Sequence, residues 1–295
     1  GFMTPMRVLL IGRQGQLAQA VIKLAATSGI DCEAIGRPII DLADAATTGP
    51  VLSAQLSGEG KPDIVINTAA YTNVDAAEND QEAAARINAV APGEIAAACA
   101  EADIPLIHIS TDYVYAGEND RALLETDTTA PTSVYSQTKL DGEKAVAANW
   151  HKHVIIRTSW LYGGPTGNFY ATMDRLSQSR DVFRVVDDQT GCPTYAPNLA
   201  EVVLKVTRQV VAGEARWGIF NYCDDSAMSW AEFAATIFAS LGRTQCRVEP
   251  VSTRAYGADA PRPAWSVLDC HRIEQVYGVT QASFEEALLT LANTP

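Results

Sequence analysis

The first half of the chain alternates short apolar runs with longer segments of helical spacing. The apolar runs are typical of strands buried on both faces of a sheet, and they lie at 7–11, 34–35, 63–67, 106–110 and 154–157. Between them, apolar residues recur at helical intervals over 16–28, 82–102 and 135–149. Strands that alternate with helices of this length predict an α/β fold with a Rossmann-like, doubly wound parallel sheet.

Beyond residue 160 the pattern is less regular, and loops that contain proline and glycine separate its elements. Strands are expected at 183–186 and 219–221, and helices at 168–179, 198–211 and 229–241. We therefore expect residues 6–160 to form the main sheet domain. Residues 161–295 would form mainly a smaller α/β lobe over the carboxyl edge of the sheet, where open α/β sheets bind ligands. Some strands and helices of this lobe would return to the main domain.

Composition narrows the class of partner and the compartment. The formal net charge of −13 argues against nucleic acid, because phosphate backbones require a basic face. No apolar stretch is long enough to cross a bilayer, and the first residues do not resemble a secretory signal. The 6 cysteines are dispersed without a C-x-x-C pair, so we expect reduced structural thiols and no metal site. Together these features favour a cytoplasmic protein.

A glycine-rich loop, residues 12–18, follows the first strand and opens the first helix. Gly12 permits a tight turn there, and Gly15 lets backbone N–H groups approach a pyrophosphate at the helix N-terminus. Gln16 and Leu17 complete the loop as candidate dinucleotide-binding residues, while Ala18 is small enough for close helix–strand packing. A plain strand-to-helix turn is the alternative, but the strand–turn–helix context favours dinucleotide binding.

The tip of the second strand bears on which dinucleotide binds. NAD-binding proteins usually carry an acid there for the ribose 2′-hydroxyl, whereas arginine accommodates a 2′-phosphate. Here the strand ends at Arg37 without an acid, which favours NADPH and leaves NADH possible. Asp41 and Leu42 lie slightly farther on and could border the adenine. A solvent-facing Arg37 without a ligand is the alternative.

Tyr135 and Lys139 form the only Y-x-x-x-K of the chain and share one face of a predicted helix. A nearby lysine cation favours phenolate, so we expect it to lower the tyrosine pKa from about 10 toward the working range. Thr111 ends the preceding strand at the ligand-binding edge and can donate to the same carbonyl oxygen that Tyr135 protonates. An exposed helix pair is the alternative, but the three residues in this order after a glycine-rich loop indicate a reductase or epimerase site.

With these motifs the chain resembles the extended short-chain dehydrogenase/reductases and, within them, the dTDP-4-dehydrorhamnose reductase family. The matching segments are 15–17, 67–75, Glu78, 110–115, 135–143, 157–162, 168–169, 188–194, 229–233 and 262–263. The resemblance implies an NADP(H)-binding domain over 6–160 and a substrate-binding lobe over 161–295. It implies reduction of the C4 keto group of a dTDP-linked 4-keto-6-deoxyhexose, dTDP-4-dehydro-L-rhamnose, by NADPH, with Tyr135 protonating the C4 oxygen.

The resemblance also distributes the remaining residues over the site. Tyr135 and Lys139 would also bind the cofactor. Ala69, Ala70, Tyr71 and Thr72 would form part of the cofactor wall, and the substrate side would be lined by Thr111, Asp112, Tyr113, Trp160, Asn168 and Arg262. Of these, Asn168 and Arg262 would meet the diphosphate end. A core position is the alternative for Trp160, although its loop location after a strand favours the pocket.

Three alternatives remain open at this point. Related dehydratases carry an acid after Thr-Asp, and Tyr113 has no carboxylate for that elimination, so simple reduction is favoured. A reductase or epimerase of another nucleotide-linked 4-keto sugar is the second possibility, and a non-catalytic NADP-binding regulatory subunit is the third.

Some relatives dimerise around magnesium held by a carboxylate just after the glycine-rich loop. Here 18–20 supply none, which favours a monomer or a weak homodimer.

Overall fold

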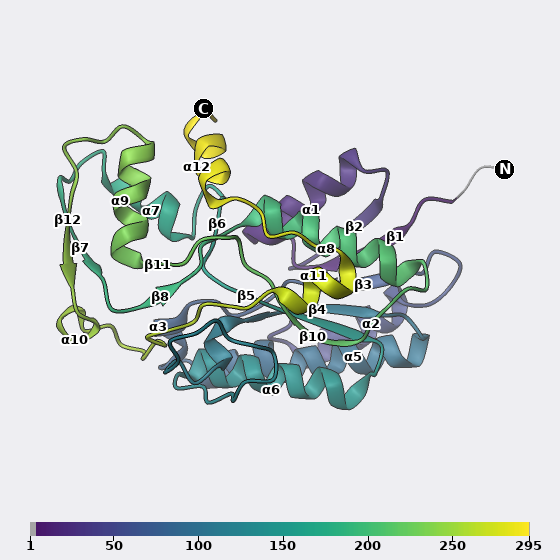
Figure 1. Ribbon diagram of the computed structural model, residues 1–295. Coiled ribbons are helices and arrows are strands. Elements are labelled where there is room, and N and C mark those ends of the chain that lie inside the picture. The colour runs from purple at the N-terminus through teal and green to yellow at the C-terminus, as the bar shows by residue number, and fades with distance from the viewer. Residues whose placement is uncertain (1–3, 295) are drawn as a thin grey trace.

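A parallel sheet of six strands forms the centre of the computed structural model, which describes residues 4–294 (Figure 1). Its strands are β1 (Arg7–Ile11), β2 (Asp31–Ile35), β3 (Ile64–Asn67), β4 (Leu106–Thr111), β5 (His153–Thr158) and β10 (Gly218–Asn221). Their order across the sheet is β10-β5-β4-β3-β1-β2, and every neighbouring pair is parallel. The chain order reverses between β1 and β3, and open parallel sheets bind ligands at such a switch point.

Helices cover both faces of this sheet (Figure 1). One face carries α1 (Gln16–Thr27), α8 (Ala196–Val211) and α11 (His271–Tyr277), and the other carries α2 (Ala45–Gln55), α5 (Ala91–Ala102) and α6 (Val134–Asn149). Val21 of α1 and Val203 of α8 pack in one buried cluster with Ile66 of the sheet. On the other face Ile95 and Val146 pack against the sheet in a second cluster. Because both faces are covered, the inner strands β1 and β3 are apolar and buried along most of their length, as the sequence pattern predicts, whereas the edge strand β2 keeps Asp31 and Glu33 exposed.

The predicted helix over 82–102 is interrupted. It consists of α4 (Gln81–Ala85), a π-helical turn over Arg86–Val90, and α5. Pro92 explains the interruption, because it has no N–H to donate to the carbonyl oxygen of Asn88 four residues earlier. A Cβ atom at Gly142 of α6 would overlap that same oxygen, so α6 approaches the π-helical turn closely. Such single π turns occur frequently at functional sites.

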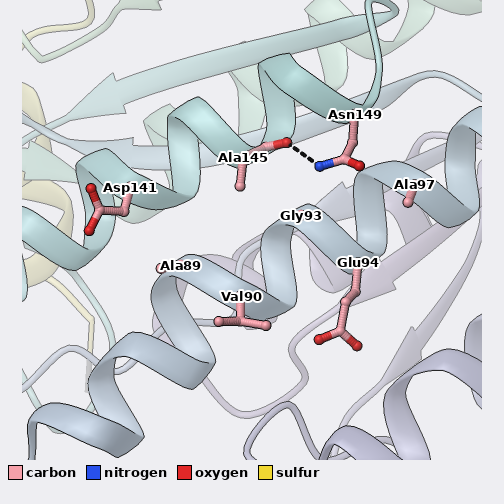
Figure 2. A pocket seen from close by; sticks show the side chains of 8 residues that line it. All are labelled: Ala89, Val90, Gly93, Glu94, Ala97, Asp141, Ala145 and Asn149. Carbon is pink, nitrogen blue, oxygen red and sulfur yellow. Dashed lines mark hydrogen bonds between the residues drawn. The ribbon is translucent and has the colours of Figure 1, made fainter.

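The outer side of α5 and α6 forms a shallow groove lined by small residues and by a few larger side chains such as Glu94 and Asp141 (Figure 2). Ala89, Gly93, Ala97 and Ala145 contribute to it, and an added Cβ at Gly93 would lie 3.0 Å from the Cβ of Ala145. The groove runs along the helix pair on the side that faces away from the sheet. None of the candidate catalytic residues lines it.

The second lobe is built from short strand pairs and helices with their own core (Figure 1). Its strands are β6 (Leu161–Tyr162), β7 (Val182–Val186), β8 (Thr190–Gly191), β9 (Thr194–Tyr195), β11 (Met228–Ser229) and β12 (Arg247–Val251), and its helices are α7 (Phe169–Leu176), α9 (Trp230–Ser240), α10 (Thr253–Tyr256) and α12 (Phe284–Ala292). Strands pair as β6 with β9, β7 with β12, and β8 with β11. Tyr162, Phe233 and Phe284 pack edge to face at the centre of the lobe.

Residues after 160 also complete the main sheet. The strand predicted at 219–221 is β10, which pairs with β5 at the sheet edge, and the helix predicted at 198–211 is α8, which packs on α1. The chain therefore passes back and forth between the lobe and the sheet. These returns fix the lobe against the carboxyl edge of the strands.

Within residues 4–294, no helix combines the length and the apolar character that crossing a bilayer requires. The same residues contain no group of three or more histidine, cysteine or acidic side chains arranged to hold a metal ion. All 6 cysteines are free thiols, and the Sγ atoms of Cys223 and Cys270 lie 3.7 Å apart in the core without a bond between them.

Candidate active site

The carboxyl ends of β1, β3 and β4 meet the start of α6 at one edge of the sheet, and the predicted site residues gather there. The glycine-rich loop follows β1, residues 68–73 follow β3, and Thr111 is the last residue of β4. Tyr135 is the second residue of α6, which Ser133 caps by accepting a hydrogen bond from the backbone N–H of Ser136. The topology thus brings together segments that are separated by more than 100 positions in the chain.

The glycine-rich loop has the geometry of an anion site. Gly12 adopts φ +105°, and an added Cβ there would overlap the Thr68 side chain, so the turn requires glycine. Gly15 caps the N-terminus of α1 without a side-chain hydrogen bond, and an added Cβ would meet no atom of residues 4–294 within 4 Å. Packing within this described part of the chain therefore does not demand glycine at position 15. Open space in front of uncapped N–H groups of a 12-residue helix fits a bound pyrophosphate.

The side chains of the next two residues, Gln16 and Leu17, make contacts within the protein. The Gln16 amide donates to the carbonyl of Leu161 at 3.1 Å and accepts from the N–H of Gly164 at 3.2 Å. The Leu17 side chain is buried in the core. These two residues can therefore serve a cofactor only through their backbone. Gln16 has a second role that the motif did not reveal, since it ties the lobe to the start of α1.

Two arginines, not one, lie at the tip of β2. Arg37 follows the strand and is exposed, and Arg13 of the glycine-rich loop donates a hydrogen bond to its carbonyl oxygen at 2.5 Å. Sequence reasoning missed Arg13, although its place directly after Gly12 faces the neighbouring strand tip. Asp41 accepts a hydrogen bond from the Ala43 N–H at 3.0 Å, so its carboxylate closes a local turn. Leu42 is buried in the core cluster of this face.

The loop after β3 is held by Asn88 of the π-helical turn. Its residues Ala69, Ala70, Tyr71 and Thr72 are at least partly exposed along the edge of the site. Asn88, buried in the π-helical turn, accepts from the Tyr71 N–H at 2.8 Å and donates to the Tyr71 carbonyl at 3.1 Å. Its amide also donates to the hydroxyl of Thr138 on α6 at 3.2 Å. Sequence reasoning missed Asn88, whose only signal was the proline four residues later.

Tyr135, Thr111 and Lys139 lie together at the end of β4. Thr111 donates to Asp112 Oδ1 at 3.1 Å and accepts from the Tyr113 N–H at 3.2 Å. Lys139 is 3% exposed, and its Nζ donates to the carbonyl oxygen of Ile109 at 2.8 Å. The helix therefore presents the phenol at the mouth of the site and the ammonium one turn deeper.

Burial sets the protonation of this pair. It raises the pKa of Tyr135 to about 12, partly opposed by the hydrogen bond with Thr111 and reinforced by the charge of Asp112. Burial also lowers the pKa of Lys139 to about 8, against the attraction of Glu143. The expectation that the lysine lowers the tyrosine pKa is therefore wrong for this structure, because desolvation dominates. At neutral pH the phenol keeps its proton, which is the form required to donate one.

On the substrate side, Asp112 and Tyr113 follow Thr111 directly. Asp112 is 2% exposed, its Oδ2 has no hydrogen-bond partner within residues 4–294, and burial raises its pKa to about 7. The ring of Tyr113 packs edge to face against Tyr135, with centroids 6.1 Å apart. Burial raises the pKa of the Tyr113 phenol above its usual range, so the phenol stays neutral and supplies no carboxylate at this position.

Trp160 is held in a backbone conformation that large residues rarely adopt. It has φ +47°, and its indole stacks on that of Trp230, with ring centroids 3.6 Å apart and planes 8° from parallel. An added Cβ at Gly191 would overlap the Trp160 ring, so the other side is closely packed too. Strained residues cluster at binding sites. The indole remains partly exposed, which fits a pocket wall better than the core position weighed above.

The two residues expected at the diphosphate end form hydrogen bonds within the protein. The Asn168 amide caps α7 by accepting from the Ala171 N–H at 2.9 Å, and it donates to the carbonyl of Gly164 at 2.8 Å. Arg262 forms a bidentate pair with Asp75, with N···O distances of 2.8 and 3.0 Å. Asp75 lies in the first turn of α3 (Val74–Ala77), next to the cofactor-side loop. Arg262 therefore bridges the lobe and the main domain.

Comparison with known proteins agrees with this geometry. The family model for the RmlD substrate binding domain matches residues 6–294. A dTDP-4-dehydrorhamnose reductase from Sinorhizobium fredii is 36% identical over 287 residues, covering 96% of this chain and 95% of that protein. The chain belongs to the dTDP-4-dehydrorhamnose reductase family. A member from Escherichia coli K12 is 37% identical over 238 residues, covering 79% and 80%.

Solved structures of the family share the fold throughout. The dTDP-4-dehydrorhamnose reductase of Clostridium acetobutylicum has a TM-score of 0.89 and 34% identity, covering 97% of this chain and 98% of that one. The enzyme of Bacillus anthracis, solved in complex with NADP, has a TM-score of 0.88 and 32% identity with the same coverage. The predicted Rossmann-like parallel sheet and the family resemblance are confirmed.

Proposed function

We propose that this protein reduces the C4 keto group of dTDP-4-dehydro-L-rhamnose to give dTDP-L-rhamnose, with NADPH as the reductant. The observation that carries the proposal is the placement of Thr111, Tyr135 and Lys139 beside an uncapped glycine-rich helix N-terminus. Family membership supports the substrate, because curated relatives over nearly the whole chain carry this reductase name.

The residues of the main domain fit a dinucleotide. The glycine-rich loop would hold its pyrophosphate through backbone N–H groups, and the loop over 69–72 would flank the nicotinamide half. Arg37 and Arg13 would meet a 2′-phosphate through charge-assisted hydrogen bonds, which NADH cannot offer. When bound, the cofactor supplies the hydride. NADPH is therefore the proposed cofactor, with NADH a weaker alternative.

Protein side chains supply the proton and orient the sugar. Tyr135, neutral at pH 7, donates its proton to the C4 oxygen as negative charge develops there. Thr111 donates a second hydrogen bond to the same oxygen and stabilises that charge. Lys139 is mostly protonated at pH 7 and stabilises the tyrosinate that remains. The acid and the hydroxyl thus act on the C4 oxygen, and the cation acts on the phenol.

The substrate side uses the residues around Thr111 and in the lobe. Asp112 would hydrogen-bond a sugar hydroxyl through Oδ2, which has no partner among residues 4–294, and Trp160 would pack on the hexose ring. Arg262 would share its guanidinium between Asp75 and the diphosphate. Asn168 would act by shaping the turn before α7, because its side chain is already used as the cap.

The test is a panel of nucleotide-linked 4-keto sugars with NADPH, with products identified by NMR. We expect one NADPH to be oxidised per dTDP-4-dehydro-L-rhamnose, and a 6-deoxyhexose to form. Supplied with dTDP-glucose, the protein should form no 4-keto-6-deoxy product, because Tyr113 provides no carboxylate for the elimination. Dehydration would move the protein to the dehydratase branch, and NADP binding without turnover would favour a regulatory subunit.

Three further expectations belong to the same proposal. Residues 6–160 act mainly in cofactor binding and 161–295 mainly in substrate binding. The protein works as a monomer or weak homodimer without magnesium, since residues 18–20 supply no carboxylate. It resides in the cytoplasm, where its free thiols remain reduced. Sedimentation with and without magnesium tests the oligomeric expectation.

A further inference from the structure

A buried ion pair lies directly behind the catalytic lysine. Glu143 of α6 and Arg157 of β5 are each 3% exposed, and the Arg157 Nη2 lies 2.7 Å from Glu143 Oε1. The Arg157 Nε donates to the same carboxylate at 3.0 Å, and Ser110 of β4 donates a further hydrogen bond to Oε2. Both carboxylate oxygens are thus satisfied. The carboxylate is fixed by two strands of the sheet.

The helix places this carboxylate in line with the catalytic pair. Tyr135, Lys139 and Glu143 follow one another at intervals of four residues, so they share one face of α6. That face packs on β4, where Lys139 donates to the carbonyl of Ile109 and Ser110 donates to Glu143. The ammonium therefore lies between a phenol on the side of the site and a carboxylate on the inner side.

We propose that Glu143 is a positioning residue for the reduction: held by Arg157 and Ser110, its carboxylate keeps the Lys139 ammonium charged and in place beneath Tyr135. The inference rests on the proposed function, because it concerns the same proton transfer. A buried ammonium without a nearby anion tends to lose its proton. Burial already lowers the pKa of Lys139, and Glu143 is the charge that acts against this.

The other titratable groups near Lys139 do not replace Glu143. His108 of β4 is buried beside it, and burial together with the lysine charge lowers its pKa well below the usual range, so it stays neutral. Asp112 acts on Tyr135 rather than on the lysine. Arg157 is a cation and would repel the ammonium if its charge were not balanced by Glu143. The carboxylate is thus the counter-charge of the buried cluster.

The test compares the pH dependence of kcat in two variants whose effects differ in sign. In Glu143→Gln the ammonium loses its counter-charge and faces an unbalanced Arg157. The alkaline limb of the profile should therefore move to lower pH by about one unit. In Arg157→Met the carboxylate is left without its partner and attracts the ammonium more strongly, so the limb should move to higher pH. A purely structural role predicts lower activity in both variants, with the limb unmoved.

Asp141→Asn is the matched control. It removes one negative charge from the same helix, but this carboxylate is exposed and accepts a hydrogen bond from the Gln137 amide at 2.9 Å. Its profile should coincide with that of the unmodified protein. Because a lone buried charge can prevent folding, the double variant Glu143→Gln/Arg157→Met provides a second route, since it removes the pair without leaving an unpaired ion. Its alkaline limb should also move to lower pH, though by less.

An alkaline limb that stays in place in folded Glu143→Gln or in the double variant would overturn the inference. Failure of the proposed function is distinguishable from this, because the unmodified protein would then not turn over the keto sugar at all. In that case NADPH affinity is measured against pH in the same variants. It should fall at lower pH in Glu143→Gln than in the unmodified protein, and an unchanged profile would again overturn the inference.

Discussion

The cofactor side and the substrate side of this site are built in different ways. On the cofactor side, glycine-rich backbone at a strand–helix junction leaves open space at Gly15, and little else is needed. On the substrate side, the Asn168 and Arg262 side chains form hydrogen bonds with other residues of the protein. Trp160 is packed between Trp230 and Gly191. Backbone geometry forms the first site, and side-chain contacts across the lobe form the second. Substitutions on the two sides should therefore change different measured quantities.

The largest effect is expected where the two sides meet, at Tyr135. Tyr135→Phe removes the proton donor and keeps the ring packed against Tyr113. We expect kcat to fall by about 10²–10⁴-fold, because positioned acid–base groups contribute on that order. NADPH affinity, measured by fluorescence titration, should change little. Near-normal kcat in the folded variant would remove Tyr135 from the catalytic role.

The second effect is on stability and concerns Asp112. Its pKa is about 7 in the folded protein and about 3.8 when unperturbed, so the folded state binds the proton more tightly. The contribution of Asp112 to the free energy of unfolding is therefore fully present below about pH 4. It is lost as the pH rises toward 7, at roughly 1.4 kcal/mol per pKa unit.

Asp112→Asn should remove this loss. Urea unfolding at pH 5 and pH 8 measures it: relative to the unmodified protein, the variant should be stabilised more at pH 8 than at pH 5. Lys139 acts in the opposite direction at higher pH, because its lowered pKa of about 8 adds stability above that value in both proteins. Equal differences at the two pH values would show that Asp112 is charged in the folded state.

How far the sequence predicts each side follows from the same contrast. Strands at 7–11 and 106–110, the Gly12 turn and the Tyr135–Lys139 spacing are local patterns, and the structure places them as predicted. Asn88 and Arg13 could not be found in this way, because their roles depend on contacts with Tyr71 and the Arg37 carbonyl across the fold. The spacing of residues in the sequence predicts local backbone geometry, but it does not reveal hydrogen-bond partners that lie far away in the chain.

The pKa shifts and ion pairs of the site also could not be predicted from the sequence. The Y-x-x-x-K spacing correctly places phenol and ammonium on one helix face, but the direction of the tyrosine pKa shift depends on burial. Burial depends on the packing of the helix on β4 and on the Tyr113 ring, which the motif does not contain. The Arg157–Glu143 pair likewise requires strand and helix to be packed together. The protonation and pairing of such charges depend on partners from other elements, so they become apparent only in the structure.

The third prediction tests the substrate side through Arg262. Arg262→Gln removes the bidentate pair with Asp75 and the cation proposed to meet the diphosphate. A charged hydrogen bond contributes about 1.5–3 kcal/mol, so we expect substrate KM to rise by roughly 10–100-fold. The NADPH dissociation constant should stay within about twofold, because backbone groups hold the pyrophosphate.

Asp75→Asn is the companion variant, because it frees the guanidinium without removing it. KM should rise less than in Arg262→Gln, since the cation remains but is no longer held in place. If both variants weakened NADPH as much as substrate, the separation of the two sides would be wrong. The bridge would then hold the cofactor loop next to α3.

The smallest effect is expected at the cofactor edge, from Arg37 and Arg13. Arg37→Ala should weaken NADPH by about tenfold and leave NADH nearly unchanged, because a guanidinium–phosphate contact exists only for the phosphorylated cofactor. Arg13→Ala should show the same selectivity, since its guanidinium lies against the Arg37 carbonyl. In the double variant the losses should be less than additive, because neighbouring groups that share one ligand are coupled. Titrations with both cofactors measure this, with Lys23→Ala on α1 as a charge-matched control. Equal losses for NADH and NADPH would show that the arginines shape the loop and do not read the 2′-phosphate.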